Sequence, residues 1–261
     1  MDLKIREANN SDKIQVLKFC KNTFSWGDYV EHVWDFWISE GHLFLGEKEN
    51  PVGICHALCS NDQVWIEGIR IDPNFRRQNI ASELIKHAET VGKEKNLSYS
   101  FMLIDTENSV SLLMANSLNY AVFQTWNFYS IEPKINLNHN VVFEKSLDRQ
   151  LCSYYVKSWR WFPIDDDTLT SFYAENRIVK SSINDKKSIA ILSDSEHFEK
   201  TLIVTLFSNS NDTLFEILSF LQNFGVEKKY ERIQILTREK LPDFDSLELK
   251  ISFHLMKKSL V

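Results

Sequence analysis

The sequence predicts an α/β fold with two domains, of which the second is smaller. Segments with the two-residue alternation of strands are interleaved along the chain with segments of helical spacing. The order strand, polar loop, helix, strand occurs in both halves, which indicates either a diverged internal duplication or two independent uses of a common order. The length of 261 residues, at roughly 150 per domain, also fits two small domains.

Composition places the chain among globular proteins and excludes several classes. Hydrophobic residues make up 43% and charged residues 25%, while 7 glycines and 5 prolines are too few for a collagen-like or linker-dominated chain. At a formal net charge of −6 the chain as a whole lacks the basic footprint of a nucleic-acid binder, which leaves only a local basic patch as an alternative, so we expect no nucleic-acid partner. No apolar run reaches the ~18–20 residues that span a bilayer, and residues 1–4 lack a signal-peptide pattern. We therefore expect a cytoplasmic protein with no membrane partner.

The 4 cysteines are too few for a disulfide scaffold in a chain of this length, which favours a reduced protein. Within residues 55–59, Cys55, His56 and Cys59 superficially resemble a metal site. In a strand, however, a rise of ~3.3 Å per residue separates Cys55 from Cys59 by ~13 Å and puts His56 on the opposite face. One tetrahedral ion cannot join them, so the sequence predicts no bound metal.

The first elements expected are a short strand at residues 3–8 and a helix. Ser11 is in the position of a helix cap, because Ile14, Leu17 and Cys20 follow it at helical spacing.

A second helix is clearer, because Asp28 can cap its start and Gly41 ends it. Five apolar residues form a stripe at the i, i+3, i+4, i+7, i+8 positions of one face: Val30, Val33, Trp34, Trp37 and Ile38. This stripe is most simply part of the core, and the alternative is that one edge of it lines a substrate site.

Three strands follow, at residues 42–47, 52–59 and 64–71. A turn at residues 48–51 makes the first two a hairpin, and Asn61-Asp62 turns the chain into the third. Asp72-Pro73 ends that third strand, because proline lacks the N–H donor that a sheet needs.

A polar loop at residues 74–79 leads into another helix, whose apolar face lies within residues 81–91. A buried strand at residues 99–104, a helix opened by Asn108 and a long aromatic strand at residues 120–130 complete the first half.

The second half begins after a polar segment at residues 132–140, which we interpret as a linker. Pro163 and the acidic run that follows it are typical of a helix start, and that helix extends to about Glu175. The remaining expected elements are strands at 188–192 and 201–207, a helix at 213–224, and strands at 232–237 and 249–256.

The segment of residues 65–81 carries the chemistry. Here a strand ends at a loop whose backbone N–H groups lie at the start of a helix, and such a helix end binds phosphate through its unpaired donors and its dipole. Arg76 and Arg77 add positive charge. The alternative is an ordinary turn with solvated arginines, since the Walker and Rossmann glycine patterns are both absent.

This segment resembles motif A of the GNAT superfamily of N-acetyltransferases, in which a strand and a proline precede Arg/Gln-x-x-Gly-x-Gly/Ala. Arg76 matches the first position, Asn79 the glycine position and Ala81 the last. The resemblance extends over about residues 3–130 and includes Asn108 and the aromatic strand after it. The Glu-Gly-x-Arg version at residues 67–70, with a further C-terminal domain, is similar to the histidine N-acetyltransferase-like branch.

The resemblance implies a GNAT fold over residues 1–133, with a central mixed, mostly antiparallel sheet flanked by helices, and a degenerate GNAT-like domain over residues 134–261. The loop at residues 208–212 of that second domain has neither Arg nor Gly, so we expect it to bind no CoA. In the family, loop amides hold the pyrophosphate of acetyl-CoA and the preceding strand pairs with its pantetheine arm. Carried over residue by residue, the implied acetyl-CoA contacts are Ile69, Arg70, Ile71, Arg76, Arg77, Gln78, Asn79, Ile80, Ala81, Ser82 and Asn108.

Two positions depart from the family pattern. Asn79 replaces glycine, and because asparagine tolerates positive φ better than most residues, the turn can survive. The family often has a tyrosine on the later helix that protonates the departing thiolate, and the matching position here is Ala115. The CoA thiolate is a stable leaving group near neutral pH, so the missing acid need not abolish turnover.

The candidate catalytic residue is Glu67. An alkylammonium must lose a proton before it can attack a thioester, and a carboxylate can remove it. Strand periodicity puts Glu67 on the side of Trp65, Ile69 and Ile71, where apolar neighbours are expected to raise its pKa. A backbone N–H near Ile71 is expected to stabilise the oxyanion. The alternative is that Glu67 pairs with an Arg or Lys across the sheet.

The residues that open the second helix, Trp26, Asp28 and Tyr29, are candidates for acceptor binding, because this helix borders the acceptor site in the family. Asp28 holds either an ammonium group or only the helix cap. The sequence thus predicts an acetyl-CoA-dependent N-acetyltransferase, a monomer or homodimer, that acts on a small-molecule amine or amino acid. The alternative is an acyl-CoA-binding sensor that has lost catalysis, as Asn79 and Ala115 suggest.

Overall fold

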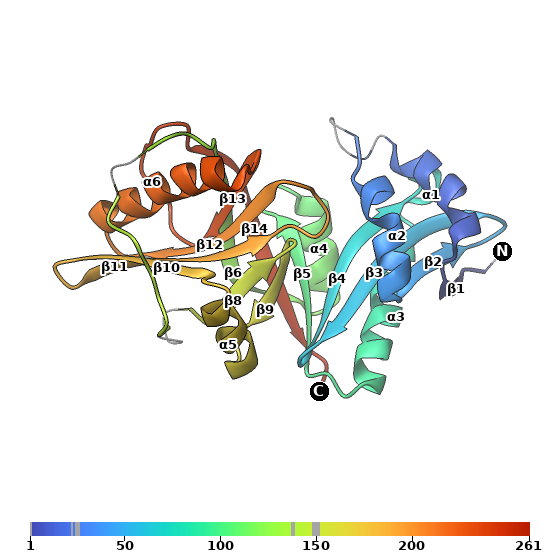
Figure 1. Ribbon diagram of the computed structural model, residues 1–261. Helices are drawn as coiled ribbons and strands as arrows, with labels where there is room; N and C mark the ends of the chain where they lie inside the picture. The colour runs from blue at the N-terminus through green and yellow to red at the C-terminus, as the bar shows by residue number, and fades with distance from the viewer. Residues whose placement is uncertain (1, 22, 24–26, 137–138, 148–151) are drawn as a thin grey trace. The chain divides into compact units, whose positions relative to one another are not determined.

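The structure is a computed structural model, which describes residues 2–21, 23, 27–136, 139–147 and 152–261. The chain forms two compact units, Met1–Phe123 with His254–Val261, and Gln124–Phe253 (Figure 1). It passes from one unit to the other within β6 (Ala121–Ile131) and returns within β14 (Glu248–Ser259). The division therefore differs from the boundary at 133/134 expected from the sequence, because the last residues of the chain belong to the first unit.

The sheet of the first unit has the order β1-β2-β3-β4-β5-β14. Its strands pair antiparallel from β1 to β4, while β4 and β5 are parallel because α3 connects them. The elements in chain order are β1 (Lys4–Glu7), η1 (Asn10–Asp12), α1 (Lys13–Cys20), α2 (Val30–Glu40), β2 (Leu43–Glu47), β3 (Pro51–Ser60), β4 (Gln63–Ile71), η2 (Pro73–Phe75), α3 (Ile80–Glu94), β5 (Tyr99–Asp105) and α4 (Ser109–Ser117).

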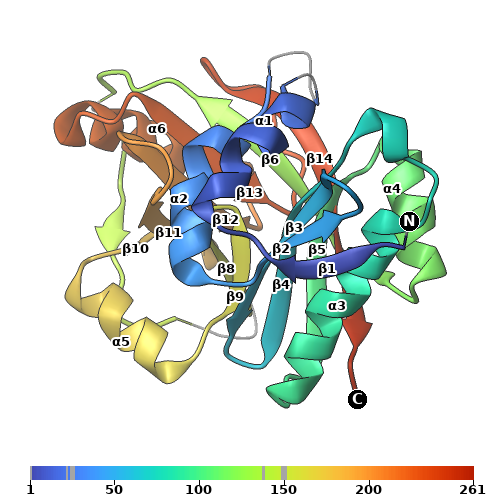
Figure 2. The same cartoon turned by 90° about the vertical axis from the view of Figure 1, so that its right-hand side faces the viewer.

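Helices cover both faces of this sheet, and successive strand residues supply the two cores (Figure 2). Phe44 faces α3, while Leu43 and Leu45 on either side of it face α1 and α2. Each core includes an apolar helix stripe that the sequence indicates, and the one on α2 contains Trp34 and Trp37. The unit is therefore a three-layer α/β/α structure.

The second unit repeats the same arrangement. Its sheet has the order β6-β13-β12-β11-β10-β7, in which β12 and β13 are parallel because α6 connects them. A separate hairpin is formed by β8 and β9. The elements are β7 (Val142–Phe143), β8 (Tyr154–Lys157), β9 (Arg160–Pro163), α5 (Asp166–Ala174), β10 (Ile178–Ile183), β11 (Lys186–Asp194), β12 (Thr201–Ser208), α6 (Asn211–Lys228) and β13 (Arg232–Thr237).

The α/β class and the mixed, mostly antiparallel sheet are confirmed, and each unit contains a parallel pair joined by a helix. The strands β7 to β10 were not expected. Ser11 is not the cap of α1, because it lies within η1, whose cap is Asn9, and α1 follows with Asp12 as its N-cap residue. In the described part of the chain, no helix is long and apolar enough to cross a membrane.

Candidate functional site

The β3–β4 hairpin places Glu67 opposite a histidine. The two-residue turn at Asn61 and Asp62 sets the register, which pairs Ser60 with Gln63 and His56 with Glu67. His56 Nδ1 lies 2.9 Å from Glu67 Oε1, within hydrogen-bond distance. The cross-strand neighbour of Glu67 is thus a histidine, whereas the sequence alternative was an Arg or Lys.

A β-bulge in β4 follows directly after Glu67. The register jumps from His56–Glu67 to Ile54–Arg70, so Gly68 and Ile69 together lie opposite one residue of β3. Gly68 has φ +65°, and a Cβ atom on it would lie 2.2 Å from the Trp37 ring. Glycine is therefore required here both by the backbone angle and by the approach of the indole.

The bulge changes which residues share a face of β4 with Glu67, so this part of the prediction is wrong. Because it inserts one residue, the side-chain alternation of β4 reverses at this point. Ile69 and Ile71 consequently pack into the core that contains Ile66, on the α3 side of the sheet. Glu67 keeps Trp65 as a same-face neighbour, as expected, but it does not share that face with Ile69 and Ile71.

Two ring nitrogens hold the carboxylate of Glu67. His56 Nδ1 meets one oxygen, and Trp65 Nε1 donates to the other at 3.1 Å. The Glu67 side chain is 16% exposed, so it lies near the surface of the unit while its partners are buried. This arrangement fixes the plane of a carboxylate that keeps partial access to a ligand.

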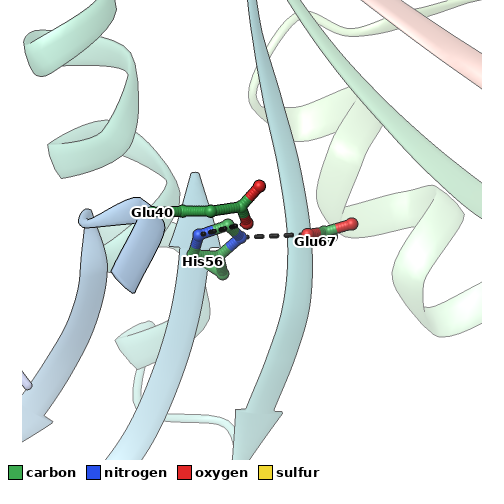
Figure 3. Close-up of side chains that lie close together, drawn as sticks. All are labelled: Glu40, His56 and Glu67. Carbon is green, nitrogen blue, oxygen red and sulfur yellow. Dashed lines mark hydrogen bonds and ion pairs between the residues drawn. The ribbon is translucent and has the colours of Figure 1, made fainter. Parts of the chain in front are cut away.

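His56 is itself held firmly. It is fully buried, and its ring stacks on Trp37 with centroids 5.0 Å apart and an interplanar angle of 8°. Its Nε2 lies 3.6 Å from Glu40 Oε2 at the end of α2, which is beyond hydrogen-bond distance. Figure 3 shows the imidazole between the two carboxylates, with one nitrogen turned to each.

Glu40, His56 and Glu67 are three residue types that bind metals, and their nearest ligand atoms lie within 4.8 Å of one another. However, the two carboxylates approach opposite nitrogens of one ring, so the three groups do not face a common point. The sequence expectation for His56 is correct in one respect, because Cys55 faces the α3 core while His56 faces the other side. Sequence reasoning missed Glu40 and the contact of His56 with Glu67.

Strands β4 and β5 separate beyond the hairpin site. Their parallel ladder runs from Gln63–Tyr99 to Ile66–Met102 and stops there, although β4 continues to Ile71. Beyond this point, β4 leads into η2 and β5 leads into the loop before α4. Residues 67–71 of β4 therefore have an edge that β5 does not cover, and such an edge can pair with an extended ligand.

The start of α3 offers backbone donors. Asn79 is the residue before the helix and has φ +61°, so the asparagine in the glycine position adopts the expected left-handed conformation. Its side chain makes no cap hydrogen bond, and the first intrahelical bond runs from Glu83 N–H to the Asn79 carbonyl. The N–H groups of Ile80, Ala81 and Ser82 precede that bond, so they are available to an anion. Arg76, Arg77, Gln78 and Asn79 are all exposed beside them.

Other predicted site residues have structural partners. Asp28 accepts two hydrogen bonds from Arg70, at 2.6 and 3.1 Å, and one from Val30 N–H at the start of α2, so its carboxylate is already paired with a guanidinium. The guanidinium of Arg70 lies 5.1 Å from the Tyr29 ring centre, and burial raises the pKa of the Tyr29 phenol. Asn108 caps α4 through Ser111 N–H. Trp26 lies outside the described residues.

Ala115, at the position where a tyrosine was sought, is fully buried in the core beside α3. Its carbonyl accepts hydrogen bonds from Leu118 and Tyr120 N–H. This position therefore serves the packing of α4 and supplies no acid.

Comparison with known proteins gives a family match and whole-chain structural matches. Residues 11–119 match the family model described as the acetyltransferase (GNAT) family. No curated protein matches significantly. A GCN5-related N-acetyltransferase from Sphaerobacter thermophilus is 11% identical, with 99% of this chain and 96% of that chain covered and a TM-score of 0.64.

Two further solved structures also match both halves of the chain. A Thermoplasma acidophilum protein provisionally described as an acetyltransferase is 13% identical, with 98% and 99% covered and a TM-score of 0.64. A tandem GNAT protein from the clavulanic acid biosynthesis pathway is 9% identical, with 100% and 99% covered and a TM-score of 0.57. At these identities the matches show the fold, which is a tandem arrangement of two GNAT-like units.

Proposed function

We propose that this chain, whose residues 11–119 match the acetyltransferase (GNAT) family model, transfers an acetyl group from acetyl-CoA to a primary amine of a small molecule or amino acid. The family match over these residues supports an acyltransferase. The choice of donor is supported above all by the start of α3, where Asn79 leaves the first-turn N–H groups uncapped beside two exposed arginines.

The separated end of β4 supports the same donor. A pantetheine arm is extended and carries amide groups, so it can hydrogen-bond to the edge of residues 67–71 that β5 leaves uncovered. A diphosphate on the N–H groups of Ile80, Ala81 and Ser82 and an arm along β4 would bring the thioester toward the bulge. Glu67 is the carboxylate at that bulge.

The proposed reaction is a direct transfer. Glu67 accepts a proton from the acceptor ammonium, and the neutral amine nitrogen then forms a bond to the acetyl carbon. The carbon–sulfur bond breaks, and its electron pair leaves on the CoA thiolate. The nitrogen, which is positively charged once bonded to the acetyl carbon, loses its second proton to that thiolate through solvent, so the products are the amide and free CoA thiol. A backbone N–H near Ile71 stabilises the transient oxyanion. No side-chain acid is assigned to the thiolate, because Ala115 is the residue at that position.

The second candidate is an acyl-CoA sensor without turnover, and Ala115 is the observation that favours it. Binding and transfer are separable by experiment. We expect acetyl-CoA to raise the melting temperature, because a ligand that binds only the folded state stabilises it by RT ln(1 + [L]/Kd), about 2.7 kcal/mol at 100 times Kd. Thiol release over a panel of amines and amino acids then tests transfer. Stabilisation without release on any amine would favour the sensor, and no stabilisation would contradict both candidates.

Asn79 offers a matched test of the diphosphate site. Asn79→Asp keeps the shape and tolerance for positive φ but adds a negative charge at the start of α3. We expect about a tenfold weaker Kd for acetyl-CoA from repulsion, with unchanged or slightly greater stability, because an acidic group suits a helix N-terminus. Isothermal titration and urea unfolding measure the two effects.

The control is Asn79→Gly, which keeps the backbone angle without the charge and should bind acetyl-CoA as tightly as the parent. If the aspartate and glycine variants bind acetyl-CoA equally well, the diphosphate does not lie at this helix start.

A further inference from the structure

We propose that His56 is a positioning residue for Glu67, which acts by donating from Nδ1 to Glu67 Oε1 and so holding the carboxylate toward the acceptor amine. This inference rests on the proposed role of Glu67 as the base and deepens it. Because the His56 side chain is fully buried, we assign it a role through Glu67 rather than on the substrate.

The contacts of Glu67 carry the first step. A glutamate side chain can rotate about several bonds, and a general base must lie within hydrogen-bond reach of the proton that it removes. His56 Nδ1 fixes Oε1 at 2.9 Å and Trp65 Nε1 fixes Oε2 at 3.1 Å. With one ring donor on each oxygen, rotation of the carboxylate about its last bond would break both contacts.

The rigidity of His56 carries the second step. Its place on β3 is set by the hairpin register, and its ring is fully buried and stacked on Trp37. Trp37 in turn fills the space above Gly68, the residue next to Glu67 in the bulge. The same indole therefore fixes both the imidazole and the backbone that carries Glu67, so the two ends of the His56–Glu67 hydrogen bond are held by one packed group.

The third step identifies the nitrogen that matters. A base must begin as a carboxylate, which only accepts hydrogen bonds, so His56 Nδ1 must carry the hydrogen. Nε2 has no hydrogen-bond partner among the described residues, and the 3.6 Å to Glu40 is an ion-pair contact at most. The positioning role therefore belongs to Nδ1.

Two substitutions separate the nitrogens. In His56→Asn, the amide nitrogen occupies about the place of Nδ1 and can still donate to Glu67. In His56→Gln, the longer side chain puts its amide nitrogen near the place of Nε2 and withdraws the donor from Glu67. Both variants lose the stacking on Trp37, so each controls for the loss of packing in the other.

We expect His56→Gln to lower kcat by about 30- to 100-fold, since small misplacements of a catalytic group are costly, with the KM for acetyl-CoA nearly unchanged. His56→Asn should recover most of that loss. In the Glu67→Gln background, His56→Gln should lower kcat by less than about twofold more, because the residue through which it acts is already gone. Equal kcat in the two His56 variants, or full additivity with Glu67→Gln, would overturn the proposal.

A measurement on the resting protein separates this proposal from the proposed function. Nitrogen-15 NMR of the histidine rings should show His56 with its hydrogen on Nδ1, and the signal should change in Glu67→Ala. A ring with its hydrogen on Nε2 alone contradicts the positioning role whatever the activity. If instead the parent releases no thiol on any amine, the acetyltransferase proposal fails, while the spectrum still decides whether His56 donates to Glu67.

Discussion

Gly68→Ala is expected to lower the free energy of unfolding by about 3–5 kcal/mol. The residue has φ +65°, which costs any side chain about 1 kcal/mol or more, and the added Cβ would lie 2.2 Å from a carbon of the Trp37 ring. Trp37 is fully buried against His56 and Tyr29, so the indole cannot move aside without displacing its neighbours. Urea unfolding monitored by tryptophan fluorescence gives the change in midpoint and slope.

Gly41→Ala is the matched control. Gly41 also has a positive φ, +81°, but a Cβ there would meet no atom within 4 Å. With ψ 176° it lies in a region that almost only glycine adopts, so Gly41→Ala should show the backbone cost alone, about 1–3 kcal/mol. The excess for Gly68 measures the overlap with Trp37, and equal destabilisation of the two variants would mean that the indole does not pack on the bulge. At temperatures where Gly68→Ala is folded, its kcat should also fall, because the bulge determines where Glu67 points.

Much of the fold follows from local patterns in the sequence. The α2 helix carries five apolar residues on one face and ends at Gly41, and both features are present as expected. Asn108 caps α4, and Asn79 takes the left-handed conformation of the glycine that it replaces. By contrast, β8 and β9 are four-residue strands, too short for a two-residue alternation to stand out.

The pairing of His56 with Glu67 could have been predicted from the sequence. The turn at Asn61-Asp62 was expected, and a two-residue turn places each residue opposite the one equally distant on the other side. His56 lies five residues before Asn61, and Glu67 lies five after Asp62, so their contact follows from the register. Sequence reasoning missed this contact because His56 was interpreted only as a possible metal ligand beside Cys55 and Cys59.

The effect of the bulge on β4 and the contact of His56 with Glu40 could not be predicted from the sequence. A lone glycine in a strand indicates a bulge but does not say how the alternation continues, and here it reverses the faces of Ile69 and Ile71 relative to Glu67. Glu40 approaches His56 only because α2 packs on this face of the sheet through Trp37. Such a contact depends on the packing of a helix against a sheet, which no local pattern specifies.

Glu67→Gln is expected to lower kcat by about 100-fold or more at neutral pH while the Kd for acetyl-CoA stays nearly unchanged. Glutamine keeps oxygen and nitrogen atoms near those of the carboxylate but cannot accept the ammonium proton, and the proposed CoA contacts lie at α3 and along the backbone of β4. A variant without a base depends on the fraction of acceptor that is already a neutral amine. That fraction rises about tenfold per pH unit below the pKa of the amine, which for an alkylamine is about 10.4.

The loss of rate in Glu67→Gln should therefore shrink as the pH rises, whereas a variant that merely distorts the site would be slower by the same factor at every pH. The parent protein provides the pH profile of an intact base. Because the acceptor loses its proton in solution at high pH and on the enzyme at low pH, the point where the two profiles converge reports the pKa of the acceptor rather than that of the protein. Profiles that run parallel, or an unchanged kcat, would remove Glu67 from the reaction and leave its contacts with His56 and Trp65 as packing of the hairpin.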